Sequence, residues 1–265
     1  MSWLKSTIGK IIVGGILAGA VQALAILPGH AGENLDAIKA AGVLKIGTEG
    51  TYAPFTYHDT SGKLVGFDVE IGEEIAKRLG VKAEFVEGKW DGLIAGLDVK
   101  RYDAVINQVG ITDERKAKFD FSDPYIASRA ALIVREDNAD IKGFADLNGK
   151  KAAQSLTSNY GKIAEAAGAQ LVGTDGFDQS IALVVQGRAD ATINDSLSFL
   201  DFKKKQPNAP VKIAATEDDA SYSGVIVRKG DPELVAAINQ ALKDIKADGS
   251  YQRIAETYFG HDVSQ

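Results

Sequence analysis

Two residues of opposite charge follow two similar stretches of this sequence. Residues 101–107 read RYDAVIN and residues 188–194 read RADATIN, so five of the seven positions match. The first stretch leads to Arg115, and the second leads at once to Asp195. A guanidinium binds a carboxylate and a carboxylate binds an ammonium, so the pair predicts a site for a small zwitterion. The alternative is a chance match, because strands favour Val and Ile.

Arg115 stands where a helix does not favour a cation. It comes three residues after Thr112, which has the residue type of an N-cap, and a capping box would place Glu or Gln there. A cation in the first turn opposes the helix dipole by roughly 0.3 kcal/mol or more. A carboxylate held between the helix start and the guanidinium would offset this cost. The alternative is a surface arginine that pairs with Asp113 or Glu114.

Asp195 has two compatible interpretations. It precedes an expected helix at residues 196–202, where aspartate is a favoured N-cap. An N-cap carboxylate at the edge of a cleft can also accept hydrogen bonds from an ammonium. Both interpretations stay open on the sequence alone.

Further polar and aromatic residues fall at the ends of expected strands. A polar loop at residues 155–159 opens a helix, and its hydroxyls and backbone N–H groups either bind an anion or only cap the helix. Glu49 and Tyr52 follow one expected strand and Trp90 follows another, and the aromatic rings either belong to a core or stack on a ligand. Ligands of open α/β sheets bind beyond the carboxyl ends of the strands, so these loops are the expected binding region.

The composition excludes several other kinds of site. The 265 residues contain no cysteine, which excludes disulfides, thiolate zinc sites and a cysteine nucleophile. The three histidines have no metal-ligand spacing, and we predict neither a metal nor a cofactor. A net charge of −6 and a pI of about 5.2 argue against nucleic acid or an anionic membrane as the main partner.

The N-terminus has the pattern of a secretory signal peptide. Lys5 and Lys10 precede a short apolar run at residues 11–21, and Ala23-Leu24-Ala25 supplies the A-x-A cleavage pattern. A membrane anchor is the alternative, but spanning a bilayer takes about 20 apolar residues. We expect cleavage after Ala25, or else after Ala31, and an exported, acidic mature protein.

Apolar strands and amphipathic helices alternate along the rest of the chain, which is typical of an α/β protein with parallel sheet. The first unit has expected strands at 43–47, 82–86 and 103–107, a helix at 66–79 closed by Gly80, and a short helix at 90–97. A second unit has helix starts near Gly143 and Ser158, strands near Lys151, Leu171 and Asp190, and a helix at 178–186. Two helices, at 233–247 and 251–258, end the chain.

The second unit is expected to be inserted into the first. The apolar runs AALIVR at 130–135 and SGVIVR at 223–228 would be the two crossings between the lobes. This organisation predicts a signal peptide at 1–25, a first lobe from 26–130 and 226–265, and a second lobe from 131–225.

Five motifs and one longer run resemble a known family over essentially all of residues 43–263. They are GTxxTYxPF at 47–55, GFDVE at 66–70, ITxER at 111–115, FSxPY at 121–125, DGSYxxIAxxYFG at 248–260 and GKWDGLIAGLDVKRYDAVINQV at 88–109. The chain resembles the periplasmic solute-binding proteins of polar amino-acid ABC importers, the bacterial extracellular family 3. The run at 88–109 is most similar to the cystine-binding members.

The resemblance implies an α/β fold of the Venus-flytrap type, in which each of two lobes is a mostly parallel sheet flanked by helices and two strands cross between them. It also implies a set of ligand-binding positions: Glu49, Tyr52, Trp90, Gln108, Val109, Gly110, Arg115, Thr157, Ser158, Asn159 and Asp195. Arg115 would hold the α-carboxylate and Asp195 the α-ammonium. Tyr52 and Trp90 would flank the side chain, and Glu49 would meet the far ammonium of cystine.

The function implied by the resemblance is capture rather than catalysis. The protein would be a monomer that closes on an L-amino acid, cystine above all, and presents the closed form to an ABC permease in the inner membrane. The alternatives are a periplasmic enzyme of the cyclohexadienyl dehydratase type, which needs a general acid in the cleft, and a sensor module. The pairing of Arg115 with Asp195 favours simple binding of a zwitterion.

Overall fold

The computed structural model describes residues 33–264. The predicted signal peptide and both of its cleavage positions lie outside the described residues. Within residues 33–264, no helix is both long enough and apolar enough to cross a membrane. The same part of the chain has no group of three or more His, Cys, Asp or Glu side chains arranged to hold a metal ion.

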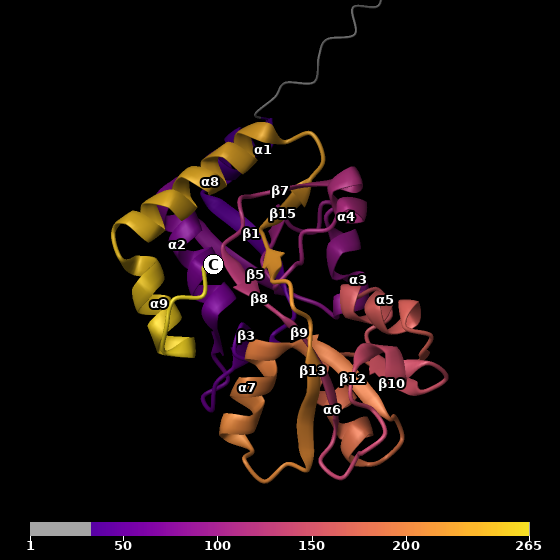
Figure 1. Cartoon of the computed structure of the whole chain (residues 1–265). Helices are drawn as coiled ribbons and strands as arrows, with labels where there is room; N and C mark the ends of the chain where they lie inside the picture. Colours follow the sequence, from indigo (N-terminus) through magenta and orange to yellow (C-terminus); the bar gives the residue numbers. More distant parts are fainter. Residues whose placement is uncertain (1–32, 265) are drawn as a thin grey trace, which may run out of the picture. The chain divides into compact units, whose positions relative to one another are not determined.

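A five-stranded sheet forms the first lobe, in the order β5-β1-β6-β15-β7. Its strands are β1 (Val43–Thr48), β5 (Lys82–Glu87), β6 (Ala104–Val105), β7 (Phe119–Phe121) and β15 (Ile226–Arg228). β1 pairs in parallel with β5 and β6, whereas β15 runs antiparallel to β6 and β7. The helices of this lobe are α1 (Glu33–Ala41), α2 (Phe67–Leu79), α3 (Trp90–Leu93), α4 (Asp113–Lys118), α8 (Pro232–Ala247) and α9 (Ser250–Phe259) (Figure 1).

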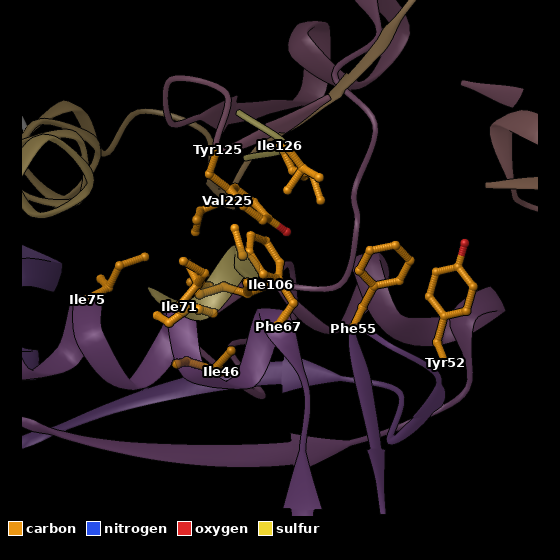
Figure 2. Close-up of a cluster of buried hydrophobic side chains, with 14 of the residues drawn as sticks. Ile46, Tyr52, Phe55, Phe67, Ile71, Ile75, Ile106, Tyr125, Ile126 and Val225 are labelled. Carbon is orange, nitrogen blue, oxygen red and sulfur yellow. The ribbon is translucent and has the colours of Figure 1, made fainter. Parts of the chain in front are cut away.

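Helix α2 shows why this lobe packs as it does. Its apolar positions recur at helical spacing, and Phe67, Ile71 and Ile75 are fully buried. Gly80 ends the helix in the left-handed conformation with φ 76°, as the sequence predicts. Figure 2 shows these side chains above Ile46 of β1 in one apolar cluster. Burial of this face fixes α2 against the sheet.

A second five-stranded sheet forms the second lobe, in the order β11-β10-β12-β9-β13. Its strands are β9 (Ala130–Arg135), β10 (Lys151–Gln154), β11 (Gln170–Gly173), β12 (Ala191–Asp195) and β13 (Val211–Thr216). β10 is parallel to β11 and β12, and β9 is antiparallel to β12 and β13. Its helices are α5 (Asn159–Ala166), α6 (Phe177–Val185) and α7 (Ser196–Lys205), with a 3₁₀ turn at Phe144–Leu147.

The two similar sequence stretches occupy equivalent places in the two sheets, because β6 and β12 are each the third strand in the same order. Asp103 donates its N–H to the carbonyl of Lys45 (2.9 Å) and accepts the N–H of Lys45 (3.0 Å). Asp190 makes the same two bonds to Lys151, at 2.8 and 2.7 Å. These matching contacts favour two related units over a chance match.

The crossings between the lobes lie at the start of the two predicted apolar runs: β8 (Ile126–Ser128) ends just before the first run, and β14 (Ser221–Ser223) ends at the first residue of the second run. β8 pairs antiparallel with β14, outside both five-stranded sheets. The run at 130–135 is β9 of the second sheet, and the end of the run at 223–228 is β15 of the first. The apolar runs are buried sheet strands, and the short pair before them carries the chain across. The lobe boundaries after residues 130 and 225 stay a prediction.

A small sheet completes the first lobe beside the cleft. It consists of β2 (Thr51–Tyr52), β3 (Thr56–His58) and β4 (Leu64–Val65). Tyr52 lies at the end of the apolar cluster, and its hydroxyl points away from Phe55 (Figure 2). One side of the Tyr52 ring therefore packs in the apolar cluster, and its hydroxyl end is directed out of that cluster.

Candidate functional site

A cavity of about 470 Å³, including its opening to solvent, lies between the two sheets. Its wall comes from loops that follow β1, β5 and β6 in the first lobe and β10, β11 and β12 in the second. These are the carboxyl ends of the parallel strands, where α/β proteins bind ligands. The lining residues are Glu49, Tyr52, Trp90, Asn107, Gln108, Gln154, Ser155, Ser158, Asn159, Tyr160, Gly176, Phe177, Ser180 and Asn194.

The structure brings part of the predicted set into this wall. Glu49, Tyr52, Trp90, Gln108, Ser158 and Asn159 line the cavity, whereas Val109, Gly110, Arg115, Thr157 and Asp195 do not. Val109 is fully buried in the apolar cluster of the first lobe, and its carbonyl accepts the N–H of Gly224 at 3.2 Å. Its place in this structure is that of a core residue.

Glu49 is held at the cavity by Asn107, the last residue of the first similar stretch. The amide of Asn107 donates to Glu49 Oε2 (2.6 Å), and its oxygen accepts the N–H of Glu49 (2.8 Å) and the hydroxyl of Thr48 (3.0 Å). Burial raises the pKa of Glu49 from 4.5 to about 7, opposed by the bond from Asn107 and assisted by the nearby charge of Asp91. A carboxylate with this pKa calls for a cationic partner.

Two buried polar atoms of the wall have no hydrogen-bond partner within the described residues. They are Trp90 Nε1, a donor, and Gln108 Oε1, an acceptor, and both side chains are 8% exposed. Gln108 also has a left-handed backbone with φ 52°, which is uncommon for a residue other than glycine. Buried polar atoms without partners are costly, and a ligand with both donors and acceptors would satisfy these two.

Arg115 lies beside the cavity, with its guanidinium 5.4 Å from the centre of the Trp90 ring. Its Nη1 donates to the carbonyl of Gly110 at 2.9 Å, and its backbone N–H bonds the N-cap hydroxyl of Thr112 at 3.2 Å. Burial lowers the pKa of Arg115. No carboxylate in residues 33–264 forms an ion pair with it.

The surface-arginine alternative is therefore wrong in this structure. Asp113 pairs with Lys116 at 2.8 Å, and Glu114 pairs with Lys162 of the second lobe. A methyl group added at Gly110 would lie 3.5 Å from Arg115 Nη1 and 3.6 Å from Asn159 Nδ2. The guanidinium and this side-chain amide thus converge on the same glycine and form a cluster of donors.

Asp195 is the N-cap of α7, as one of its two interpretations predicts. The residue is 1% exposed, and its Oδ1 accepts the N–H of Leu197 at 2.8 Å. Ser128 donates to Oδ2, and the Tyr160 hydroxyl lies 3.4 Å from the same oxygen. Burial raises the pKa of Asp195 to about 6, opposed by these hydrogen bonds. Tyr160, which lines the cavity, therefore contacts Asp195 from the cavity side.

The polar loop at residues 155–159 of the second lobe has two roles in this structure. Thr157 donates both its N–H and its hydroxyl to Asp91 of the first lobe, each at 2.9 Å. Ser158 caps α5, because its hydroxyl oxygen accepts the N–H of Gly161 at 2.9 Å. Asn159 begins the helix and faces the cavity. The predicted anion loop therefore joins the lobes at Thr157 and lines the cavity at Ser158 and Asn159.

Several other bonds join the lobes around the cavity. The Tyr52 hydroxyl donates to Asn194 Oδ1 at 2.7 Å, and Ser198 donates to the carbonyl of Ala53 at 2.9 Å. An ion pair between Lys89 and Asp175 spans 2.6 Å at the exposed rim. In this conformation the lobes touch around the cavity.

Sequence reasoning missed several residues of this site. Asn107 and Asn194 end the two similar stretches, and that position could have identified them. Asp68 is fully buried behind Gln108 and belongs to the GFDVE motif, which was the available signal. Ser155 belongs to the polar loop at residues 155–159, which the sequence did indicate as an anion-binding or capping loop. The other lining residues carry no distinguishing signal apart from their nearness to strand ends: Gln154, Tyr160, Gly176, Phe177 and Ser180.

The chain matches known proteins over most of its length. The model of the bacterial extracellular solute-binding proteins, family 3, matches residues 44–261. The L-cystine-binding protein TcyA of Bacillus subtilis is 50% identical over 229 residues, which cover 86% of this chain and 85% of that protein.

Two similar solved structures represent different states, one open and unliganded and one bound to its ligand. The L-cystine solute receptor of Neisseria gonorrhoeae, in its unliganded open conformation, is 52% identical with a TM-score of 0.59 and covers 88% of this chain and 100% of its own. An ancestral arginine-binding protein bound to arginine is only 42% identical, yet its TM-score is 0.78, covering 83% of this chain and 99% of its own. The lower-identity, ligand-bound structure fits better, which agrees with the bonds that join the lobes. The chain belongs to the bacterial extracellular solute-binding proteins of family 3.

Proposed function

We propose that this protein is the periplasmic substrate-binding component of a polar amino-acid ABC transporter, and that its ligand is L-cystine. The observation that carries the proposal is the half-buried guanidinium of Arg115, which has no carboxylate partner in residues 33–264 and stands beside a cavity with unsatisfied polar atoms. A ligand carboxylate would supply the missing charge.

Each group of the ligand can be assigned a partner in the wall of the cavity or beside it, where Arg115 lies. The α-carboxylate binds Arg115, with the Asn159 amide and the Trp90 N–H as further donors. Tyr52 and Trp90 flank the side chain. The predicted contact of the α-ammonium with Asp195 would require Tyr160 to move, because Tyr160 now lies against that carboxylate.

Cystine is favoured over other amino acids by Glu49 and by the names of two relatives. Cystine carries a second ammonium at its far end, and Glu49 is a carboxylate at the cavity whose burial raises its pKa to about 7. A bound ammonium would stabilise its ionised form. The Bacillus and Neisseria relatives, both about half identical to this chain, are named for L-cystine.

Binding and release would follow from movement of the lobes about the crossing pair β8 and β14. Two short strands are the kind of hinge that permits lobe closure, and a ligand that contacts both lobes shifts the population toward the closed form. The closed monomer would then dock on an ABC permease in the inner membrane, after export through the predicted signal peptide.

A catalytic function on the same fold is the second candidate, and Glu49 is the residue that favours it. A carboxyl with a pKa of about 7 is suited to act as a general acid. Turnover of prephenate or arogenate by the purified protein, lost in Glu49→Gln, would replace transport with a dehydratase function.

A ligand screen tests the proposal directly. The purified mature protein is heated with each of the twenty amino acids and with L-cystine, and each hit is measured by calorimetry. A ligand at a hundred times its Kd adds about 2.7 kcal/mol of stability, and a tighter ligand at the same concentration adds more. We therefore expect the largest rise in melting temperature with L-cystine. A larger rise with another amino acid would retain the transport function and change the ligand. No rise with any of them would overturn the proposal.

A further inference from the structure

A buried carboxylate stands behind the cavity wall without a cation. Asp68, the second residue of α2, is fully buried, and no Lys, Arg or His of residues 33–264 forms an ion pair with it. Burial of a charge without a cation is costly unless hydrogen bonds compensate. Asp68 accepts three of them: from the Gln108 N–H (2.8 Å), from Gln108 Nε2 (2.9 Å) and from the Tyr125 hydroxyl (3.0 Å).

Two of these bonds hold a single residue, Gln108, by its backbone and by its side chain at once. The backbone bond accompanies the left-handed conformation of Gln108. The side-chain bond sets the orientation of the amide, because Gln108 Nε2 donates to Asp68 Oδ1, an oxygen that also accepts from the Tyr125 hydroxyl. The NH₂ group of Gln108 therefore faces Asp68. The oxygen Oε1 is then turned away from Asp68, and among residues 33–264 this buried acceptor at the cavity wall has no hydrogen-bond partner.

The neighbours of Gln108 indicate what this oxygen receives. Gly110, two residues further along the same loop, carries the carbonyl that binds Arg115 Nη1. The ammonium and carboxylate of an α-amino acid leave the same carbon atom, so an acceptor for one must lie close to the donors for the other. A hydrogen-bond acceptor on the loop that positions Arg115 meets this requirement.

We propose that Asp68 is a positioning residue that fixes the Gln108 side-chain oxygen as the acceptor for the α-ammonium of the bound amino acid. The inference rests on the proposed amino-acid binding function and adds to it the residue that sets the polarity of the wall. Asp68 itself does not touch the ligand. A purely structural role is the competing explanation, since Tyr125 also bonds Asp68. The Tyr125 ring belongs to the apolar cluster and stacks on Phe67 at 6.2 Å between ring centres (Figure 2).

The test compares two ligands that differ only in their ammonium groups, L-cystine and its deaminated analogue dithiodipropionate. Calorimetry, with competition for weak binding, gives the ratio of the two affinities. In Asp68→Asn the new amide can donate to Gln108 Oε1, so the acceptor is no longer fixed toward the cavity. We expect a loss of roughly tenfold for L-cystine with little change for dithiodipropionate. The ratio therefore falls.

Two more variants separate positioning from folding. Gln108→Met removes the acceptor itself and should lower the ratio as Asp68→Asn does, which keeps the test decisive if Asp68→Asn fails to fold. Tyr125→Phe removes one bond to Asp68 without touching Gln108, so it should lower the melting temperature and leave the ratio unchanged.

The outcomes distinguish this inference from the function on which it rests. Equal losses for both ligands in Asp68→Asn and Gln108→Met, or no loss in either variant, would overturn the positioning role while amino-acid binding stands. If the wild-type protein prefers another amino acid, the same ratio is measured with that amino acid and its deaminated acid. Absence of binding to any amino acid would overturn both.

Discussion

The two lobes share one strand order and one repeated sequence stretch, but the segment that follows the repeated stretch differs between them. In the first lobe, Asn107 is followed by Gln108 with φ 52° and by a loop that reaches α4 at Asp113. In the second lobe, Asn194 is followed at once by Asp195, which caps α7. The strands provide equivalent scaffolds, and the connections after them make the lobes different.

The two connections differ in how far their polar side chains are hydrogen-bonded within the protein. Within the described part of the chain, the loop of the first lobe leaves Gln108 Oε1 without a hydrogen-bond partner and Arg115 without an anion. In the second lobe, the carboxylate of Asp195 receives bonds from Leu197 and Ser128. The first lobe is therefore expected to carry most of the binding energy, and the second lobe to close over the ligand.

Removal of the cation of the first lobe should give the largest effect. In Arg115→Ala the ligand carboxylate loses its charge partner in a desolvated site, a loss of about 2–5 kcal/mol. We expect calorimetry to show an affinity for L-cystine reduced on the order of a hundredfold or more. The melting temperature of the free protein should change little, because among residues 33–264 the side chain makes one hydrogen bond, to Gly110, besides its contact with the Trp90 ring.

Lys118→Ala is the matched control for Arg115. Lys118 is an exposed cation on the same helix, so its loss changes the charge without opening the site. Near-native affinity in Arg115→Ala, or an equal loss in Lys118→Ala, would place the anion receptor elsewhere and remove the contrast between the lobes.

A smaller effect, of roughly tenfold on affinity for L-cystine, is expected from Glu49→Gln. The pKa of Glu49 is raised from 4.5 to about 7, so the folded protein holds a proton that the unfolded chain releases between these pH values. The stability contributed by this proton falls as the pH rises through that window. Binding of the far ammonium needs the ionised form, so affinity for L-cystine should rise as the pH approaches and passes 7.

Glu49→Gln should flatten both pH dependences, measured by calorimetry and by thermal melting from pH 5 to pH 8. Asp68 and Asp195 keep their raised pKa values in this variant and serve as the internal background. If affinity for L-cystine is unchanged in Glu49→Gln, this carboxylate does not meet the far ammonium.

The smallest effect is expected from Asp195→Ala, and it should appear mainly in stability. Loss of an N-cap costs about 1 kcal/mol, which lowers the melting temperature of a protein of this size by roughly 2–4 °C. Asp195→Asn keeps a capping side chain and should recover most of that loss. If both variants instead bind L-cystine far more weakly at an unchanged melting temperature, Asp195 is the ammonium receptor that the family resemblance implies.

Local patterns in the sequence predicted much of this structure. Gly80 ends α2, Thr112 caps α4 and Ser158 caps α5, because each depends on residues within one helical turn. The strand ends that bear Glu49 and Trp90 also followed from short apolar runs. Features that depend on residues close together in the sequence could therefore be predicted from it.

Contacts that form only when distant segments meet were not accessible in this way. Thr157 binds Asp91 of the other lobe, 66 residues away in the sequence, and Tyr160 lies against Asp195. Whether a polar side chain faces a ligand or another lobe depends on that meeting. The same limit hid Asp68, whose partners are 40 and 57 residues distant.

The ion pairs at the rim have a consequence for the time that a ligand stays bound. Lys89 of the first lobe faces Asp175 of the second, while Glu114 of the first faces Lys162 of the second, so the charges alternate across the gap. All four side chains are more than half exposed, and salt screens such pairs. We therefore expect the closed form to be less favoured, and a bound ligand to dissociate faster, as ionic strength rises.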